Sequence, residues 1–140
     1  MSQNVLAADP GAAHVGVALI RRERISAKEY PAKHWLTAYE EIIDQFDVDV
    51  VVIEKFVLYP HKAAAQSWQA MTTSELIGAM RWIASKAGVK VVMQGADIKI
   101  PTRRQCQARN IEWKNKSKHA SDALLHLHYY LKHNKRETAC

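Results

Sequence analysis

The sequence lacks four features that mark large classes of protein. It has only two cysteines, Cys106 and Cys140, and neither lies in a C-x-x-C pair, so a disulfide framework is excluded. No stretch approaches the roughly 18 uninterrupted apolar residues that a membrane-spanning helix needs. The G-x-x-x-x-G-K-S/T run of a phosphate-binding loop is also missing. Residues 1–6 have neither the charged start nor the apolar run of a secretory signal, so we expect a cytoplasmic protein with free thiols.

The chain has 140 residues, of which 48% are apolar and 24% are charged, and this composition is typical of one globular domain. We find no internal repeat, linker or low-complexity tract. The sequence therefore predicts a single domain over residues 1–134, followed by a frayed polar tail over residues 135–140.

Acidic residues are too few to balance the basic ones, and the excess is local. The chain carries 20 Lys and Arg against 14 Asp and Glu, for a net charge of +6. Residues 97–118, here called the basic segment, hold seven basic and two acidic side chains, which is +5 of that total. The basic residues are Lys99, Arg103, Arg104, Arg109, Lys114, Lys116 and Lys118, with Trp113 among them. Such a segment is either a solvated face or a phosphate-binding strip.

Hydrophobic periodicity predicts an α/β fold. The expected elements are strands at 5–8, 15–20 and 24–30, a helix at 35–46, a strand at 48–53, a helix at 61–87, a strand at 89–93, a short helix capped by Thr102, and a helix from 117 or 118 to 132. Hairpins at the start and helical crossovers later predict a mixed sheet, with three antiparallel strands followed by parallel strands and with helices on both faces.

Two acidic residues, Asp9 and Glu54, each directly follow a predicted buried strand. If those strands are parallel neighbours, both carboxylates emerge at the edge where open α/β sheets bind ligands. Close carboxylates repel, so the pair would need a metal or a shared proton. A strand-end acid that caps a helix or faces water is the alternative.

His119 and Asp122 are three residues apart in the last helix, so they share a face, and we expect Asp122 in its first turn. Alone, this spacing also suits a capping arrangement. Combined with Asp9 and Glu54, it indicates an open oxygen-rich site for Mg²⁺ or Mn²⁺, and two such ions can clamp a phosphodiester.

Three motifs resemble those of the RuvC family of Holliday junction resolvases, in the RNase H-like superfamily. They are VLAADPG at 5–11 with GVA at 16–18, VVIE at 51–54, and HASDA at 119–123. The resemblance implies an RNase H-like fold and a structure-selective endodeoxyribonuclease of DNA recombination and repair. It implies Asp9, Glu54, His119 and Asp122 as ligands of two Mg²⁺ ions per site, with Mn²⁺ able to substitute, and Lys118 as a catalytic side chain that neutralises the reacting phosphate.

The segment between the last strand and the last helix departs from the family pattern. Residues 94–118 are shorter than usual and rich in arginine. A compact chain of this kind resembles the bacteriophage members, which implies branched DNA, including flaps and forks, as substrate in a bacterial or infected cell. Phosphates would then contact Lys99, Arg103, Arg104, Arg109, Lys114 and Lys116.

Lys55, Phe56 and Tyr59 follow Glu54 at the mouth of the expected crevice. An aromatic ring there can stack on an unpaired base at a branch point, or Phe56 can simply be buried where the strand ends.

The longest predicted helix carries two apolar stripes, although packing on a sheet requires only one. The second stripe contains Trp68, Met71, Ala79 and Trp82. We expect it to form a homodimer interface, and cover by nearby loops is the alternative.

Three other functions share some of these features. An RNA-processing nuclease of the YqgF type has the same Asp-x-Gly opening, but Ile53-Glu54 speaks against it. An actin-like ATPase needs a second lobe that 140 residues do not supply. A non-catalytic module that binds branched DNA would have lost its metals. The sequence assigns no role to His126, His128 or His133.

Overall fold

The computed structural model describes residues 3–56 and 63–134, and for residues 63–70 it describes the backbone only. Its elements are β1 (Val5–Pro10), β2 (His14–Arg21), β3 (Arg24–Pro31), α1 (Ala32–Gln45), β4 (Val50–Glu54), α2 (Ala63–Lys86), β5 (Lys90–Gln94), the 3₁₀ turn η2 (Ala96–Ile98), α3 (Lys99–Ala108) and α4 (Lys118–His133).

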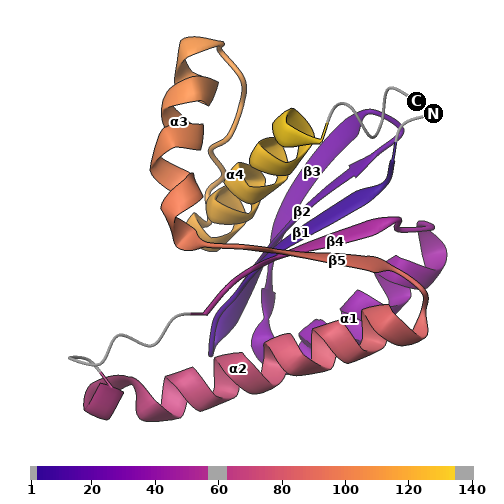
Figure 1. The fold of residues 1–140 in the computed structure, drawn as a ribbon, viewed down its shortest axis with the longest axis vertical. Coiled ribbons are helices and arrows are strands. Elements are labelled where there is room, and N and C mark those ends of the chain that lie inside the picture. Colours follow the sequence, from indigo (N-terminus) through magenta and orange to yellow (C-terminus); the bar gives the residue numbers. More distant parts are fainter. Residues whose placement is uncertain (1–2, 57–62, 135–140) are drawn as a thin grey trace.

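The five strands form one sheet in the order β3-β2-β1-β4-β5. β1 pairs antiparallel with β2, and β2 pairs antiparallel with β3, whereas β1, β4 and β5 run parallel. Helices α1 and α2 cover one face, and α4 crosses the other face with α3 packed against it (Figure 1). This confirms the predicted mixed α/β sheet with helices on both faces.

Alternate residues of the central strands pack on opposite faces of the sheet, because successive strand side chains point in opposite directions. Leu6 and Ile53 face α1 and α2, where they join a core with Trp35, Tyr39 and Met80. The core on the opposite face contains Val5, Ala7, Ala18, Val50, Val52, Ala123, Leu124, Leu127 and Tyr130. Asp9 and Glu54 continue the second set, so their positions place both on the face that α4 covers.

One helix start differs from the sequence prediction and another agrees with it. Helix α3 begins at Lys99 rather than at Thr102, whose side chain is buried instead of capping the helix. Helix α4 begins at Lys118, and the Ser117 hydroxyl caps it by accepting a hydrogen bond from the Ala120 amide at 3.1 Å. Asp122 is therefore in the second turn rather than the first, and the helix dipole acts on it less than expected.

Strand β5 is an edge strand, so most of it is only half-buried, although the sequence predicted a fully buried strand. After α2, Gly88 adopts a positive φ of 73°, as expected of a residue that ends a helix. Cys106 is buried as a free thiol, and Cys140 and the predicted tail lie outside the described residues. None of the helices in the described ranges is long and apolar enough to span a membrane.

Candidate active site

The sheet brings Asp9 and Glu54 together at the carboxyl ends of two adjacent parallel strands. The register pairs Ala8 with Ile53, so the next residues along both strands are the two acids. Each side chain is largely buried, with 7% of Asp9 and 9% of Glu54 exposed. The expected convergence of these carboxylates is thus present in the structure.

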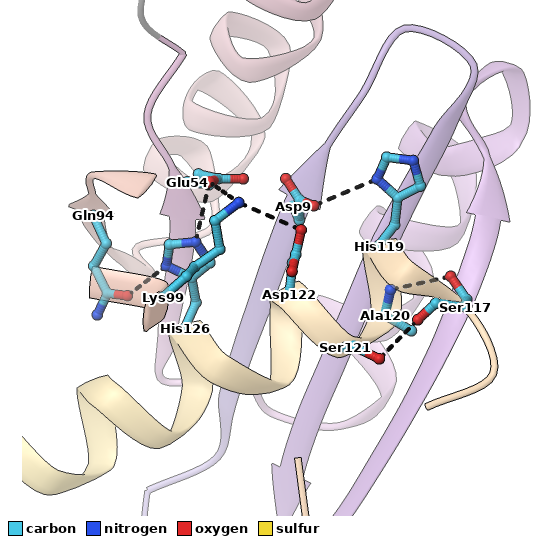
Figure 2. A network of polar contacts seen from close by, with 10 residues as sticks. All are labelled: Asp9, Glu54, Gln94, Lys99, Ser117, His119, Ala120, Ser121, Asp122 and His126. Atoms are coloured by element: carbon cyan, nitrogen blue, oxygen red, sulfur yellow. Dashed lines mark hydrogen bonds and ion pairs between the residues drawn. The ribbon is translucent and has the colours of Figure 1, made fainter. Parts of the chain in front are cut away.

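Helix α4 adds Asp122 to this pair, and a glycine allows it to approach. Gly16 lies opposite Asp9 on β2, and a Cβ atom on Gly16 would collide with the His119 carbonyl and the Ala120 amide. The absence of a side chain lets the first turn of α4 touch the sheet. Asp122 then lies beside Asp9 in Figure 2. We call Asp9, Glu54 and Asp122 the carboxylate cluster.

Lys99 lies inside the carboxylate cluster, whereas the sequence placed it among residues that bind DNA phosphates. Its Nζ atom is 2.9 Å from Glu54 Oε1 and 3.4 Å from Asp122 Oδ2. The turn η2 and the early start of α3 direct this side chain back over the end of β4 (Figure 2). Lys99 is therefore the counter-ion of the cluster.

The electrostatics of the cluster follow from burial and proximity. Burial raises the pKa of Asp9 well above its usual range, and neighbouring Glu54 raises it further, so Asp9 keeps a proton. Burial acts on Glu54 in the same direction, but contacts with His126, Asp9 and Lys99 outweigh it and hold the pKa of Glu54 below its usual range. Burial would lower the pKa of Lys99, yet the surrounding carboxylates raise it overall.

His119 lies at the outer rim of the cluster. Its Nδ1 atom is 3.4 Å from Asp9 Oδ2, and 40% of its side chain is exposed. The ring of His14, from the start of β2, is 6.3 Å away between centroids. His119 therefore lies next to Asp9, as expected, and its ring is accessible to solvent.

Two further residues of the site were not singled out from the sequence. His126 is fully buried, and its Nε2 atom lies 3.5 Å from Glu54 Oε1. Its Nδ1 atom is 2.8 Å from Oε1 of Gln94, the residue that pairs with Glu54 across β4 and β5. The four-residue spacing from Asp122 to His126, which puts both on one helix face, was a signal that could have found the histidine.

The remaining basic residues surround the site without entering it. Lys118 is exposed at the first position of α4 and has no ion pair within the described part of the chain, and Lys99 is the lysine that contacts the carboxylates. Arg103 lies over the Trp113 ring, 5.3 Å from its centroid, a distance typical of cation–π contacts. The other exposed basic residues of the basic segment are Arg104, Arg109, Lys114 and Lys116.

Residues after Glu54 form the other side of the site. Lys55 is exposed, and Phe56 is 37% exposed rather than buried where the strand ends. Both line a cavity of about 310 Å³ together with Glu54 and Thr73. Tyr59 lies outside the described residues.

The outer face of α2 exposes two large apolar side chains. Met71 is 55% exposed and Trp82 is 65% exposed, and Ala79 between them is half-buried. The opposite side of the helix packs Leu76 and Met80 on the sheet. The side chain of Trp68 lies outside the described residues.

The donor chemistry of the cluster suits a hard cation, although the side chains do not form a ready-made cage. Carboxylate oxygens are the ligands that Mg²⁺ prefers. Within residues 3–56 and 63–134, no three His, Cys, Asp or Glu side chains are grouped so that they could hold a metal ion. The ammonium of Lys99 and the proton on Asp9 reduce the negative charge of the cluster instead.

Comparison with known proteins gives the fold. No family model and no curated protein sequence matches the chain. The structure is similar to RuvC from Thermus thermophilus in complex with a Holliday junction substrate, with a TM-score of 0.70 and 18% identity over 98% of both chains. A second structure of Thermus thermophilus RuvC gives a TM-score of 0.65 at 18% identity over 97% of this chain and 98% of that one.

A weaker likeness is to YeaZ from Pseudomonas aeruginosa, with a TM-score of 0.51 and 16% identity. It covers 77% of this chain but only 52% of that one. The chain therefore has a RuvC-like fold over nearly its full length.

Proposed function

We propose that this protein is a divalent-metal-dependent endonuclease that cleaves branched DNA, with four-way junctions among its substrates. One observation carries the proposal: the carboxylates of Asp9, Glu54 and Asp122 converge from β1, β4 and α4 on one face of the sheet. The RuvC-like fold, which another protein uses to bind a Holliday junction, supports the choice of substrate.

The cluster's chemistry fits a divalent cation. Asp9, Glu54 and Asp122 would hold it, with His119 at the rim as a further ligand or a proton carrier. The cluster sets three carboxyl groups against one ammonium, that of Lys99. Asp9 keeps its proton because it is buried close to Glu54. Bound Mg²⁺ would supply Lewis-acid polarisation of the phosphate and a lower pKa for the attacking water.

The side chains of this chain would then have distinct tasks. Asp9 would lose its proton as positive charge enters the cluster. Lys99, released from Glu54, would neutralise a non-bridging phosphate oxygen. His119 would take the proton of the attacking water at Nε2, the ring nitrogen that points away from Asp9 in Figure 2. Attack would form a P–O bond to the water oxygen and break the bond to the 3′ oxygen, which takes a proton from solvent, so the products carry a 5′ phosphate and a 3′ hydroxyl.

The DNA path is proposed from the charges around the cluster. Arg104, Arg109, Lys114 and Lys116 are exposed on α3 and the segment after it, next to α4. Lys55 and Phe56 lie on the opposite side of Glu54, where the Phe56 ring can stack on an unpaired base. This arrangement would place a branch point over the carboxylates.

We also propose a homodimer formed through the outer face of α2. A helix packed on a sheet needs one apolar face, yet Met71 and Trp82 expose a second. Two subunits would supply the two sites needed for symmetric cuts in a four-way junction.

The direct test incubates the protein with labelled four-way junction, flap, fork, linear duplex and structured RNA, each with Mg²⁺, Mn²⁺ or EDTA. We expect metal-dependent cuts in the branched DNA substrates and no cutting by Asp9→Asn. Cleavage of RNA alone would favour an RNA-processing nuclease. Binding of junctions without cleavage in either metal would favour a non-catalytic module.

A further inference from the structure

A histidine outside the expected ligand set faces the carboxylate cluster. His126 lies in α4, one turn after Asp122, and it is completely buried. Its neighbours in the same helix, Leu125 and Leu127, are equally buried but pack in the apolar core. A polar ring at such a position needs partners, and it has two of them, Gln94 and Glu54.

The partners define how the ring is held. Gln94 Oε1 lies 2.8 Å from Nδ1, which fixes the ring plane, and Gln94 is itself buried on β5. Nε2 points at Glu54 Oε1 from 3.5 Å and has no hydrogen-bond partner within the described part of the chain. Because an ionised carboxylate only accepts hydrogen bonds, the favourable arrangement carries a hydrogen on Nε2. A neutral ring meets this requirement when the Gln94 amide is turned so that its nitrogen donates to Nδ1.

Glu54 is approached from two sides at the same oxygen. Lys99 Nζ and His126 Nε2 both face Oε1, from α3 and from α4. Lys99 is partly exposed and can leave when another cation arrives, whereas His126 is enclosed between the sheet and its own helix. Of these two side chains, His126 is therefore the one placed to hold Glu54 throughout a reaction cycle.

We propose that His126, held by Gln94, is a positioning residue that fixes the Glu54 carboxylate for cation binding. The inference rests on the proposed function, because it gives Glu54 its task as a ligand. Partners of this kind that orient a metal ligand typically change metal affinity or activity by about 10- to 100-fold when they are removed.

The first test compares three variants. His126→Leu removes both contacts with little change in volume, and His126→Gln keeps an N–H donor that can reach Glu54. His128→Leu is the matched control, because it makes the same change two residues later, where the ring contacts the Glu112 carbonyl instead of the cluster. Cleavage rate, KM for the junction, the Mn²⁺ concentration for half-maximal rate and calorimetric Mn²⁺ affinity are measured for each.

We expect His126→Leu to lower kcat at fixed Mn²⁺ by about tenfold or more and to weaken Mn²⁺ binding to a similar degree, with KM for the junction unchanged. His126→Gln should restore most of the parent's kcat and Mn²⁺ affinity, and His128→Leu should change neither. Equal metal affinity in His126→Leu and the parent, or no recovery in a folded His126→Gln, would overturn the proposal.

A second test needs no nuclease activity. Long-range ¹H–¹⁵N spectra of the metal-free protein report the hydrogens on each imidazole ring. Glu54→Gln should shift the ring signals of His126 and leave those of His128 in place, and Gln94→Leu should shift them as well. Unmoved His126 signals in Glu54→Gln would refute the contact. If the parent cuts no DNA, the proposed function fails, and these spectra still decide whether His126 holds Glu54.

Discussion

The Nζ atom of Lys99 lies 2.9 Å from Glu54 Oε1, and this places the first side chain of α3 within the carboxylate cluster. Lys99 joins residues that are far apart in the sequence, from the end of β4 to the second turn of α4. Its charge stabilises the metal-free protein at the position where a cation would act. Removing it should therefore have effects that depend on the metal.

Lys99→Met should lower the free energy of unfolding by about 1–3 kcal/mol in EDTA. Breaking a fully buried ion pair costs about 3–5 kcal/mol, and partial exposure of Lys99 reduces that cost. Mg²⁺ should reduce the difference in the free energy of unfolding between the variant and the parent, because the cation replaces the positive charge of Lys99. Denaturant unfolding with and without Mg²⁺ measures this, with the exposed Lys116→Met as control. A deficit that Mg²⁺ leaves unchanged would argue against a cation site in the cluster.

Asp9→Asn should make the metal-free protein more stable while it abolishes cleavage and leaves DNA binding intact. The pKa of Asp9 is raised in the folded state. Binding of a proton by Asp9 therefore stabilises the folded protein fully only below a pH of about 4, the ordinary pKa of an aspartate. That contribution is lost as pH rises toward the raised folded value. The gain in Tm from Asp9→Asn should hence grow from pH 5 to pH 8, reaching several degrees. Calorimetric scans that show the same gain at both pH values would contradict the raised pKa.

Gly16→Ala should disrupt the site from outside it. The added Cβ would collide with the His119 carbonyl and move the first turn of α4 away from the sheet. We expect the free energy of unfolding to fall by about 3 kcal/mol or more, and cleavage to disappear. Gly78→Ala in α2 is the matched control, because nothing lies within 4 Å of its added Cβ, and it should raise stability by about 0.5–1 kcal/mol. A fully stable Gly16→Ala would mean that α4 is placed differently.

Trp82→Glu combined with Met71→Glu should convert the proposed dimer into a monomer. Sedimentation of the parent at micromolar concentration should give about twice the chain mass of 15.9 kDa, and the double variant should give the mass of one chain. Ile100→Glu, on the exposed surface of α3, is a control that should not change the mass. A monomeric parent would remove the proposed α2 interface.

Replacing Arg104 or Arg109 by Ala should weaken DNA binding without changing the cleavage rate at saturating protein. For every DNA phosphate that the variant no longer neutralises, the slope of log affinity against log salt should become shallower by about 1. Arg24→Ala, at the end of the sheet remote from Asp9, should leave affinity and slope unchanged. Equal effects of Arg104→Ala and Arg24→Ala would indicate that the basic segment acts only through net charge.

The fold and the carboxylate pair were predictable because they depend on local patterns. Asp9 and Glu54 end apolar strands, and the alternation of strand side chains sets the face on which they lie. The bounds of α4 were also predictable, because the expected helix from residue 117 or 118 to 132 matches Lys118–His133 closely. The open face of α2 was also visible as a second stripe, and Met71 and Trp82 are indeed exposed.

The positions of Lys99 and His126 were not predictable in the same way. Lys99 was indistinguishable from the other basic residues until the η2 turn and the early start of α3 placed it. The spacing from Asp122 indicates the helix face of His126, but its contacts depend on the register that sets Glu54 beside Gln94, a pairing between strands that no local pattern specifies. Contacts of both kinds arise from tertiary packing.

The carboxylate cluster draws on the first strand and the last helix of the described chain, and this has a consequence for synthesis. Asp9 leaves the ribosome early, whereas Asp122 and His126 follow more than a hundred residues later. No nascent fragment that lacks α4 can assemble the site, and proteolytic products without that helix would be inert as well. If the cluster is the nuclease site proposed above, its activity can arise only after α4 has been synthesised and has folded onto the sheet.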